Sequence, residues 1–195
     1  MAESIAELQQ KMKAQQFLDK AVKAAERGNL ELALSLCRQA VALAPHDANS
    51  RRQFHETRMR AFQSEKHGGL GLKMAELGAQ LKMGKVQALI KQNKPDEALA
   101  MAEELLDVNP LSSKLNAFYF DVAQRTNHPE ALLSAMEVLA GACPNDMELM
   151  LLLGKTYMQN GVYGRAKDCF QKVSAANPAD LNVQKLLKDA MAKDT

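Results

Sequence analysis

The chain has 195 residues, 47% of them hydrophobic and 25% charged, which allows one elongated domain or two small ones. This balance excludes a wholly disordered chain, and the absence of tryptophan makes the core mainly aliphatic. No apolar run approaches the roughly 18 residues that a membrane helix needs, and the first residues lack the pattern of a signal peptide. Three widely spaced cysteines and the lack of an export signal favour a reduced, cytoplasmic setting.

Charge is unevenly distributed, although the net charge is only +2. Residues 51–94 carry 10 positive and 3 negative charges, whereas residues 95–195 carry 9 positive and 14 negative. The basic segment either attracts an acidic partner, docks on the acidic end of a second copy, or simply solvates the outer faces of helices. The candidate basic patch consists of Arg51, Arg52, Arg58, Arg60, Lys66, Lys73, Lys82 and Lys85.

The sequence of the first half of the chain predicts helices interrupted by polar turns. A helix is expected from Ser4, and a second one follows Gly28 and ends before Pro45. Asp47 is expected to cap a third helix that runs through about Glu65. The glycine-rich stretch 66–71 is expected to break the chain, and a helix then runs from residue 72 to 92 or 93 unless Gly78 or Gly84 kinks it.

The remainder of the chain is repetitive. Pro110, Pro144 and Pro178 are spaced by 34 residues, and each ends a helical stretch with apolar or small residues on one face. Pro45 ends a similar stretch, 65 residues before Pro110. The stretch from Asp180 to Ala192 suits a final capping helix.

The pattern Leu153-Gly154-x-x-Tyr157, Ala166, Phe170, Pro178 resembles the tetratricopeptide repeat. Residues 147–180 match this pattern almost throughout, and residues 14–47 and 79–112 match mainly in the second helix, while residues 113–146 match loosely. The resemblance implies an all-α, right-handed superhelix of antiparallel helix pairs, with about four repeats, an irregular segment and a capping helix. The expected domains are 1–65, the loop 66–71, and 72–195.

In such a superhelix, the first helix of each pair lines a concave groove that holds a peptide. The methionines at these positions either re-pack around different ligands or are aliphatic core filler. A clamp for peptide carboxylates, known from some similar proteins, is absent, since Leu18 and Val22 stand at its positions. The expected groove residues are Met83, Gln87, Ile90, Lys91, Ala117, Asp121, Gln124, Arg125, Leu151, Lys155, Met158 and Gln159.

Fragments that look catalytic fail when their spacing is checked. Gly154-Lys155-Thr156 resembles the end of a phosphate loop, but Leu149 stands where the loop needs its first glycine. His55-Glu56 opens like a zinc-protease helix, but Met59 replaces the second histidine. Cys37 and Cys169 fall at buried helix positions and are expected to be small core residues. We therefore expect that the protein is not an enzyme and has neither a cofactor nor a metal site.

The leading hypothesis is a non-catalytic, cytoplasmic scaffold that binds a peptide or protein segment in the concave groove. One alternative is a chaperone for secretion or assembly, and another is binding of nucleic acid or an anionic membrane through residues 51–94. Nucleic acid is not the expected partner, because Phe54 and Phe62 are at core spacing and offer no stacking platform. The protein is expected to be a monomer or to self-associate weakly.

Overall fold

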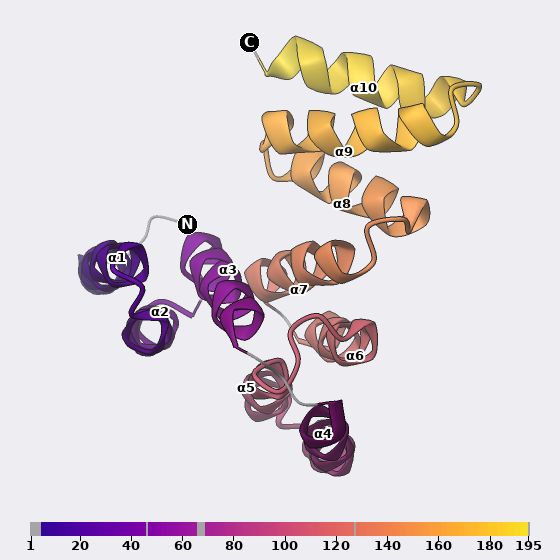
Figure 1. Ribbon diagram of the computed structural model, residues 1–195. Coiled ribbons are helices and arrows are strands. Elements are labelled where there is room, and N and C mark those ends of the chain that lie inside the picture. The colour runs from indigo at the N-terminus through magenta and orange to yellow at the C-terminus, as the bar shows by residue number, and fades with distance from the viewer. Residues whose placement is uncertain (1–4, 46, 66–68, 127, 195) are drawn as a thin grey trace. The chain divides into compact units, whose positions relative to one another are not determined.

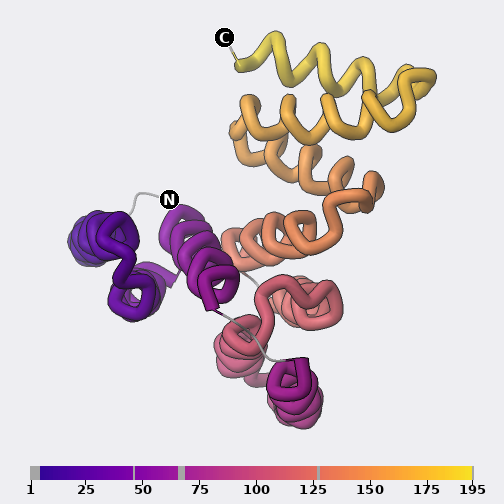
Figure 2. The backbone as a smooth tube through the Cα atoms, viewed as in Figure 1, coloured from indigo at the N-terminus to yellow at the C-terminus, as the bar shows by residue number. Residues whose placement is uncertain are grey.

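The computed structural model describes residues 5–45, 47–65, 69–126 and 128–194, and within these ranges the regular structure is entirely helical (Figures 1 and 2). The all-α fold expected from the sequence is confirmed. The helices are α1 (Ile5–Glu26), α2 (Leu30–Leu43), α3 (Ala48–Ser64), α4 (Gly69–Lys91), α5 (Pro95–Leu105), α6 (Ser113–Gln124), α7 (Pro129–Ala142), α8 (Met147–Gln159), α9 (Tyr163–Ala176) and α10 (Leu181–Lys193).

Several helices that follow one another in the chain pack against one another, as short connections favour. The packed pairs include α1 with α2, α4 with α5, and α8 with α9, while α3 packs on α2 and α10 packs on α9. The turns inside the first and last of these pairs place Gly28 and Gly161 at φ of 77° and 73°. This left-handed conformation is open to glycine at no steric cost, so both turns depend on it.

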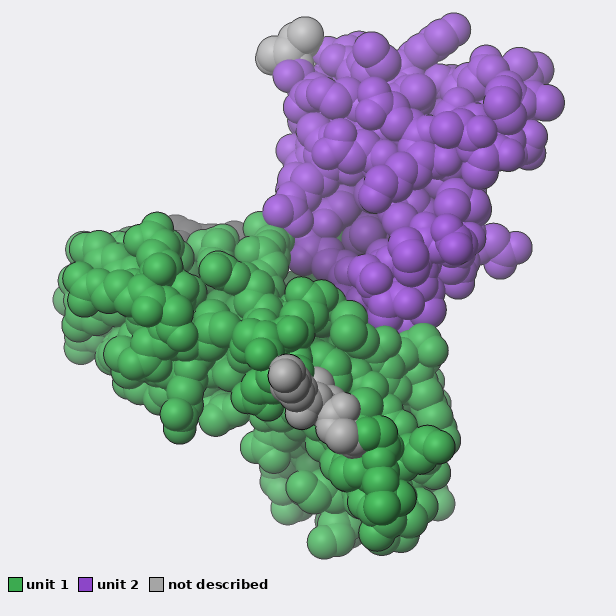
Figure 3. All heavy atoms as spheres, viewed as in Figure 1, with its two compact units in different colours: residues 1–135 green, residues 136–195 purple. Residues whose placement is uncertain are grey.

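The chain divides into two compact units, residues 1–135 and 136–195, which Figure 3 colours separately. The division falls within α7, whose final residues belong to the second unit. The domain boundaries expected at residues 65 and 72 stay a prediction.

Aspartate side chains cap the N-termini of several helices, each just after a turn in the chain. Asp47 accepts a hydrogen bond from the Ser50 backbone N–H at 2.8 Å, which confirms the cap expected for α3. Asp146 caps α8 and Asp180 caps α10 in the same way, each shortly after a proline that ends the preceding repeat helix. Each such cap satisfies a backbone donor that the helix cannot bond itself.

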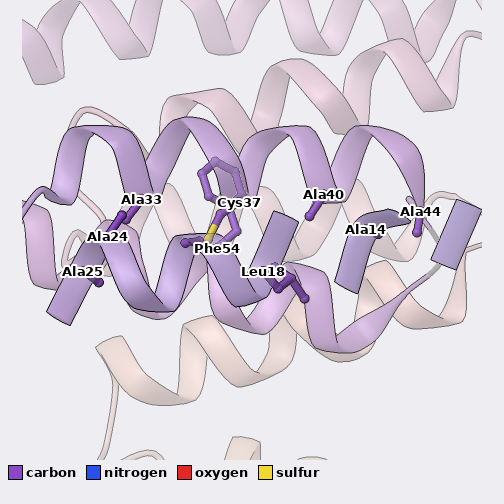
Figure 4. Close-up of a cluster of buried hydrophobic side chains, with 10 residues drawn as sticks. Ala14, Leu18, Ala24, Ala25, Ala33, Cys37, Ala40, Ala44 and Phe54 are labelled. Atoms are coloured by element: carbon purple, nitrogen blue, oxygen red, sulfur yellow. The ribbon is translucent and has the colours of Figure 1, made fainter. Parts of the chain in front are cut away.

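Small residues pack the first three helices together. Ala33 and Ala40 of α2 and Ala14 of α1 are almost fully buried, and Leu18 fills the space between the two helices (Figure 4). Phe54 of α3 closes this cluster. Alanine at these positions lets helix backbones approach closely, which leaves little room for larger aliphatic groups.

The second unit depends on a close approach at Gly154 of α8. A Cβ atom added there would lie 2.6 Å from Phe170 Cε1 and 3.0 Å from Cys169 Cβ, both on α9. The sequence led us to expect Ala166 opposite Gly154; the nearest atoms belong instead to Phe170 and Cys169. Tyr157 donates to Glu137 Oε1 at 2.5 Å, and Arg165 donates to the same oxygen at 3.0 Å.

The glycine-rich stretch 66–71 is not a loop throughout its length. Residues 66–68 lie outside the described residues, but Gly69 and Gly71 belong to α4, which continues through Gly78 and Gly84. The break expected at Gly69 and Gly71 was therefore wrong, because both glycines lie within α4. The first helix of the 79–112 repeat therefore begins ten residues before the repeat itself.

Candidate functional site

Two arginines of the predicted basic patch point inward from α3. Arg51 Nη1 donates to Glu103 Oε2 at 2.7 Å, and Arg58 Nε donates to Asp107 Oδ1 at 2.6 Å. Arg51 is 6% exposed and Arg58 is 4% exposed. Their place in an exposed patch was therefore wrong, because α5 and the turn after it supply carboxylates that neutralise them.

The surroundings of these pairs explain how two guanidinium groups tolerate burial. Arg51 Nε also donates to the Pro45 carbonyl at 2.9 Å, and the Arg58 guanidinium lies 4.1 Å from the centre of the Phe54 ring. Burial, and then the neighbouring Glu103 carboxylate, raise the pKa of Tyr119, so its hydroxyl stays protonated beside the pair. A buried charge is tolerated when an opposite charge and further hydrogen bonds offset the cost of removing it from water.

The other residues of the predicted patch do not form one surface on α3. Arg60 is exposed and Arg52 is half-buried, whereas Lys73, Lys82 and Lys85 lie exposed on α4. Lys66 lies outside the described residues. Among the described residues of the predicted patch, the exposed cations are therefore Arg60 on α3 and the three lysines on α4.

A cavity of about 180 Å³ lies between α4 and α6, and we call it the α4–α6 groove. Five expected groove residues line it, and Phe118 and Val122 are added by the structure. Met83, Ala117 and Gln124 are not among its lining residues. The complete lining is Gln87, Ile90, Lys91, Phe118, Asp121, Val122 and Arg125.

The groove combines an apolar floor with a charged rim. Phe118 and Val122 are 9% and 2% exposed, and Ile90 is half-buried beside them. On the rim, Arg125 Nη2 donates to Asp121 Oδ1 at 3.1 Å, one helical turn apart. Phe118 and Val122 were not predicted as groove residues from the sequence. Their spacing along α6 fits a buried core face as well as a face that lines the groove.

The four expected groove residues of the second unit share one face of α8. Leu151 and Met158 are half-buried, while Lys155 and Gln159 are exposed. Lys155, Met158 and Gln159 follow Leu151 by four, seven and eight residues, which are the spacings of one helical face. Their role as a groove stays a prediction.

A larger cavity of about 330 Å³ lies beside the ion pair of Arg51 and Glu103. It is bordered by Val41 of α2 and Leu99 of α5, and by His128, whose Nε2 lies 2.8 Å from Asp96 Oδ1. Sequence reasoning missed it, since its walls come from segments as much as 87 residues apart, from Val41 to His128.

The fragments that resembled catalytic motifs serve packing and helix structure. Gly154 is buried against Phe170, and Thr156 Oγ1 donates to the Leu152 carbonyl within α8. Cys37, Cys143 and Cys169 are free thiols, and Cys37 and Cys169 are buried as expected. Within the described ranges, no group of three or more metal-binding side chains comes together. None of the helices described is long and apolar enough to cross a bilayer.

Comparison with known families finds two matches, each described as tetratricopeptide repeat, over residues 83–146 and 148–180. No curated protein matches the chain. Among solved structures, the chain is similar to MamA protein at 10% identity, covering 93% of this chain and 82% of that one, with a TM-score of 0.39.

A second similar structure is YrrB, described as a TPR protein with an unusual peptide-binding site, at 16% identity, with 88% of this chain and 90% of that one covered and a TM-score of 0.39. A third is a tetratricopeptide repeat protein from Parabacteroides merdae at 15% identity, with 93% and 61% covered and a TM-score of 0.44.

Proposed function

Because this chain is a tetratricopeptide-repeat protein, with matching repeats in residues 83–146 and 148–180, we propose that it is an interaction scaffold that binds a peptide segment in the α4–α6 groove. The observation that carries the proposal is the cavity itself, which lies between the first helices of two consecutive repeats. Concave surfaces of stacked repeats are where such proteins bind extended segments.

The dimensions of the groove favour a side chain over a small molecule. Its volume of about 180 Å³ is below the roughly 300–1,000 Å³ of pockets that hold small molecules. Phe118, Val122 and Ile90 form an apolar floor for such a side chain. We therefore expect the ligand to anchor one aliphatic or aromatic side chain there.

The rim selects the residues that flank this anchor. Lys91 is exposed, and the pair of Arg125 with Asp121 is more than half exposed on both sides, so it contributes little stability and can rearrange. An acidic residue next to the anchor would be attracted by Lys91 and Arg125. A ligand with a basic residue there would bind more weakly.

A displayed library of random peptides, selected against the whole protein, tests the proposal. Selected peptides should share an apolar anchor flanked by Asp or Glu, and Ile90→Lys should weaken the best of them by tenfold or more. Lys91→Glu should reverse the preference for acidic flanks. Lys23→Glu, an exposed lysine on α1, is the matched control and should leave binding unchanged.

Selected peptides that bind the Ile90→Lys protein as tightly as the wild type would show that the groove is not the binding site. Peptides without an apolar anchor would contradict the role given to Phe118 and Val122. Either result would leave the repeat architecture intact and remove its assignment to this groove.

The finer alternatives have less to support them. Binding of nucleic acid through residues 51–94 loses two arginines, because Arg51 and Arg58 are buried in ion pairs. A chaperone for secretion or assembly would use the same apolar floor, and the peptide selection addresses it too. A non-catalytic role, a cytoplasmic location and a monomeric or weakly associating state remain part of the proposal.

A further inference from the structure

Helix α4 presents a row of large apolar side chains to solvent. Leu70, Met74, Leu77 and Leu81 are 79%, 62%, 53% and 75% exposed, and we call them the outer seam. They are spaced by four, three and four residues. This is the spacing with which one helix packs along another in a coiled coil.

The outer seam is separate from the face by which α4 joins the fold. Ala79 and Val86 are buried, and Leu72 is half-buried seven residues before Ala79. At 100° per residue, this inner row lies on the opposite side of the helix from Leu77 and Leu81. The packing of α4 against α5 therefore leaves the outer seam uncovered.

The charges around the outer seam have one sign. Lys73 and Lys85 occupy the two flanking positions of the heptad, and Lys82 lies farther round; all three are exposed. Within the described residues, none of the three forms an ion pair. The single carboxylate of α4, Glu76, is on the inner side and accepts a hydrogen bond from Asn109 Nδ2 at 2.7 Å.

Glycines beside the outer seam add a third feature. Gly71 and Gly78 flank it, and Gly84 continues its spacing; a Cβ atom at any of them would meet no other atom within 4 Å. Glycine destabilises a helix interior relative to alanine. Within the part of the chain that the structure describes, no contact requires these glycines, but they would let the backbone of a second helix approach closely.

We propose that the outer seam docks an acidic amphipathic helix of a partner protein, packed along α4 in heptad register. The narrow row with regular spacing fits the side chains of one helix, and the flanking lysines require glutamate or aspartate beside its apolar row. An anionic membrane would favour a broad apolar face and gain nothing from the glycines. A second copy of α4 would place its own lysines next to these lysines, and the like charges would repel one another.

A fluorescent peptide of three heptads, with leucine at the apolar positions and glutamate at the flanking ones, is the probe. We expect it to bind the whole protein, and we expect its counterpart with lysine for glutamate to bind at least about tenfold more weakly. Leu81→Glu should lower the affinity of the protein for the acidic peptide at least tenfold. Leu181→Glu is the matched control, because Leu181 is 76% exposed on α10, and it should have no effect.

Further variants separate this docking from the α4–α6 groove. Ile90→Lys should leave binding of the acidic heptad peptide unchanged, so a failure of one proposal is distinguishable from a failure of the other. Gly78→Ala should raise the Tm of the free protein and lower its affinity for the acidic peptide several-fold. A Gly78→Ala protein with raised Tm and unchanged peptide affinity would overturn the close approach of the two helices.

Three results would overturn the proposal as a whole. One is equal affinity for the glutamate and lysine peptides, and another is undiminished binding to the Leu81→Glu protein. The third is a different occupant: co-sedimentation with phosphatidylserine vesicles, or dimerisation in analytical ultracentrifugation, that Leu81→Glu abolishes while the acidic peptide fails to bind the wild type.

Discussion

Arg51 and Glu103 are 52 residues apart in the chain, yet the guanidinium of one lies 2.7 Å from the carboxylate of the other. Their side chains are 7% and 14% exposed. The pair joins α3, which follows the first predicted repeat (residues 14–47), to α5 of the predicted repeat at residues 79–112. The same connection is repeated by Arg58 and Asp107 at 2.6 Å.

Removing Arg51 should therefore destabilise the first unit strongly. Arg51→Ala leaves Glu103 buried without its cation, and breaking a buried pair in this way costs about 3–5 kcal/mol of unfolding free energy. Arg60→Ala, at an exposed position of the same helix, should change stability by less than about 0.5 kcal/mol. Urea unfolding followed by circular dichroism measures both.

The double variant Arg51→Met with Glu103→Leu tests the cause. Because apolar residues of similar volume can replace a buried ion pair, it should recover most of the stability that Arg51→Ala loses. A double variant as unstable as Arg51→Ala would show that packing around Arg51, and not its charge, holds α3 against α5.

Gly154→Ala should destabilise the second unit. The added methyl group would lie 2.6 Å from Phe170 Cε1, and overpacking of this kind costs about 1–3 kcal/mol. Gly141→Ala is the control in the same unit, since its methyl group would meet nothing within 4 Å and alanine favours the helix. Thermal unfolding should show a lower Tm for the first variant and an equal or higher one for the second.

Local features of the fold were predictable from the sequence, and features that depend on distant partners were not. Asp47 and the prolines act within a few residues of their own positions, so their roles as cap and terminators could be predicted. Arg51 looked like a surface residue because its neighbours in sequence are polar. Its burial is decided by Glu103, which no local pattern connects to it.

The candidate site shows the same limit. Ile90 and Asp121 could be predicted as groove residues, because the repeat resemblance fixes which helix face is concave. Phe118 could not, since an aromatic residue at core spacing is compatible with either face. Gly69 and Gly71 were expected to break the chain, because helix propensity alone disfavours glycine; they lie instead in the first turn of a helix that is anchored farther along by Ala79 and Val86.

The three free cysteines should differ in reactivity. Burial raises the pKa of Cys169 to about 11 and also raises the pKa of Cys37, whereas Cys143 is partly exposed. At pH 8 only roughly one Cys169 thiol in a thousand is ionised, and the thiolate is the reactive form. Mass spectrometry after brief treatment with iodoacetamide should find Cys143 modified first.

The same treatment in concentrated urea serves as the control, because unfolding removes the burial that protects Cys37 and Cys169. All three thiols should then react at similar rates. If Cys169 reacted as fast as Cys143 in the folded protein, the close packing of α8 against α9 would have to be open on the timescale of the labelling.

His55 should make stability depend on pH between about 6.5 and 4. Burial, and then the nearby Arg58 charge, lower the pKa of His55 to about 4 from 6.5. In that interval the unfolded chain binds a proton that the folded protein does not, so stability decreases as the pH falls through 6.5 and levels off below 4. The total loss is at most roughly 3 kcal/mol.

The difference between the wild type and His55→Gln isolates this effect from the carboxylates that titrate nearby. Glutamine cannot take up a proton, so the variant should lose less unfolding free energy between pH 6.5 and 4 than the wild type does. An NMR titration of the imidazole gives the pKa directly. A value near 6.5, or parallel stability curves for the two proteins, would mean that the His55 ring is hydrated, because a hydrated ring is protonated as readily in the folded state as in the unfolded one.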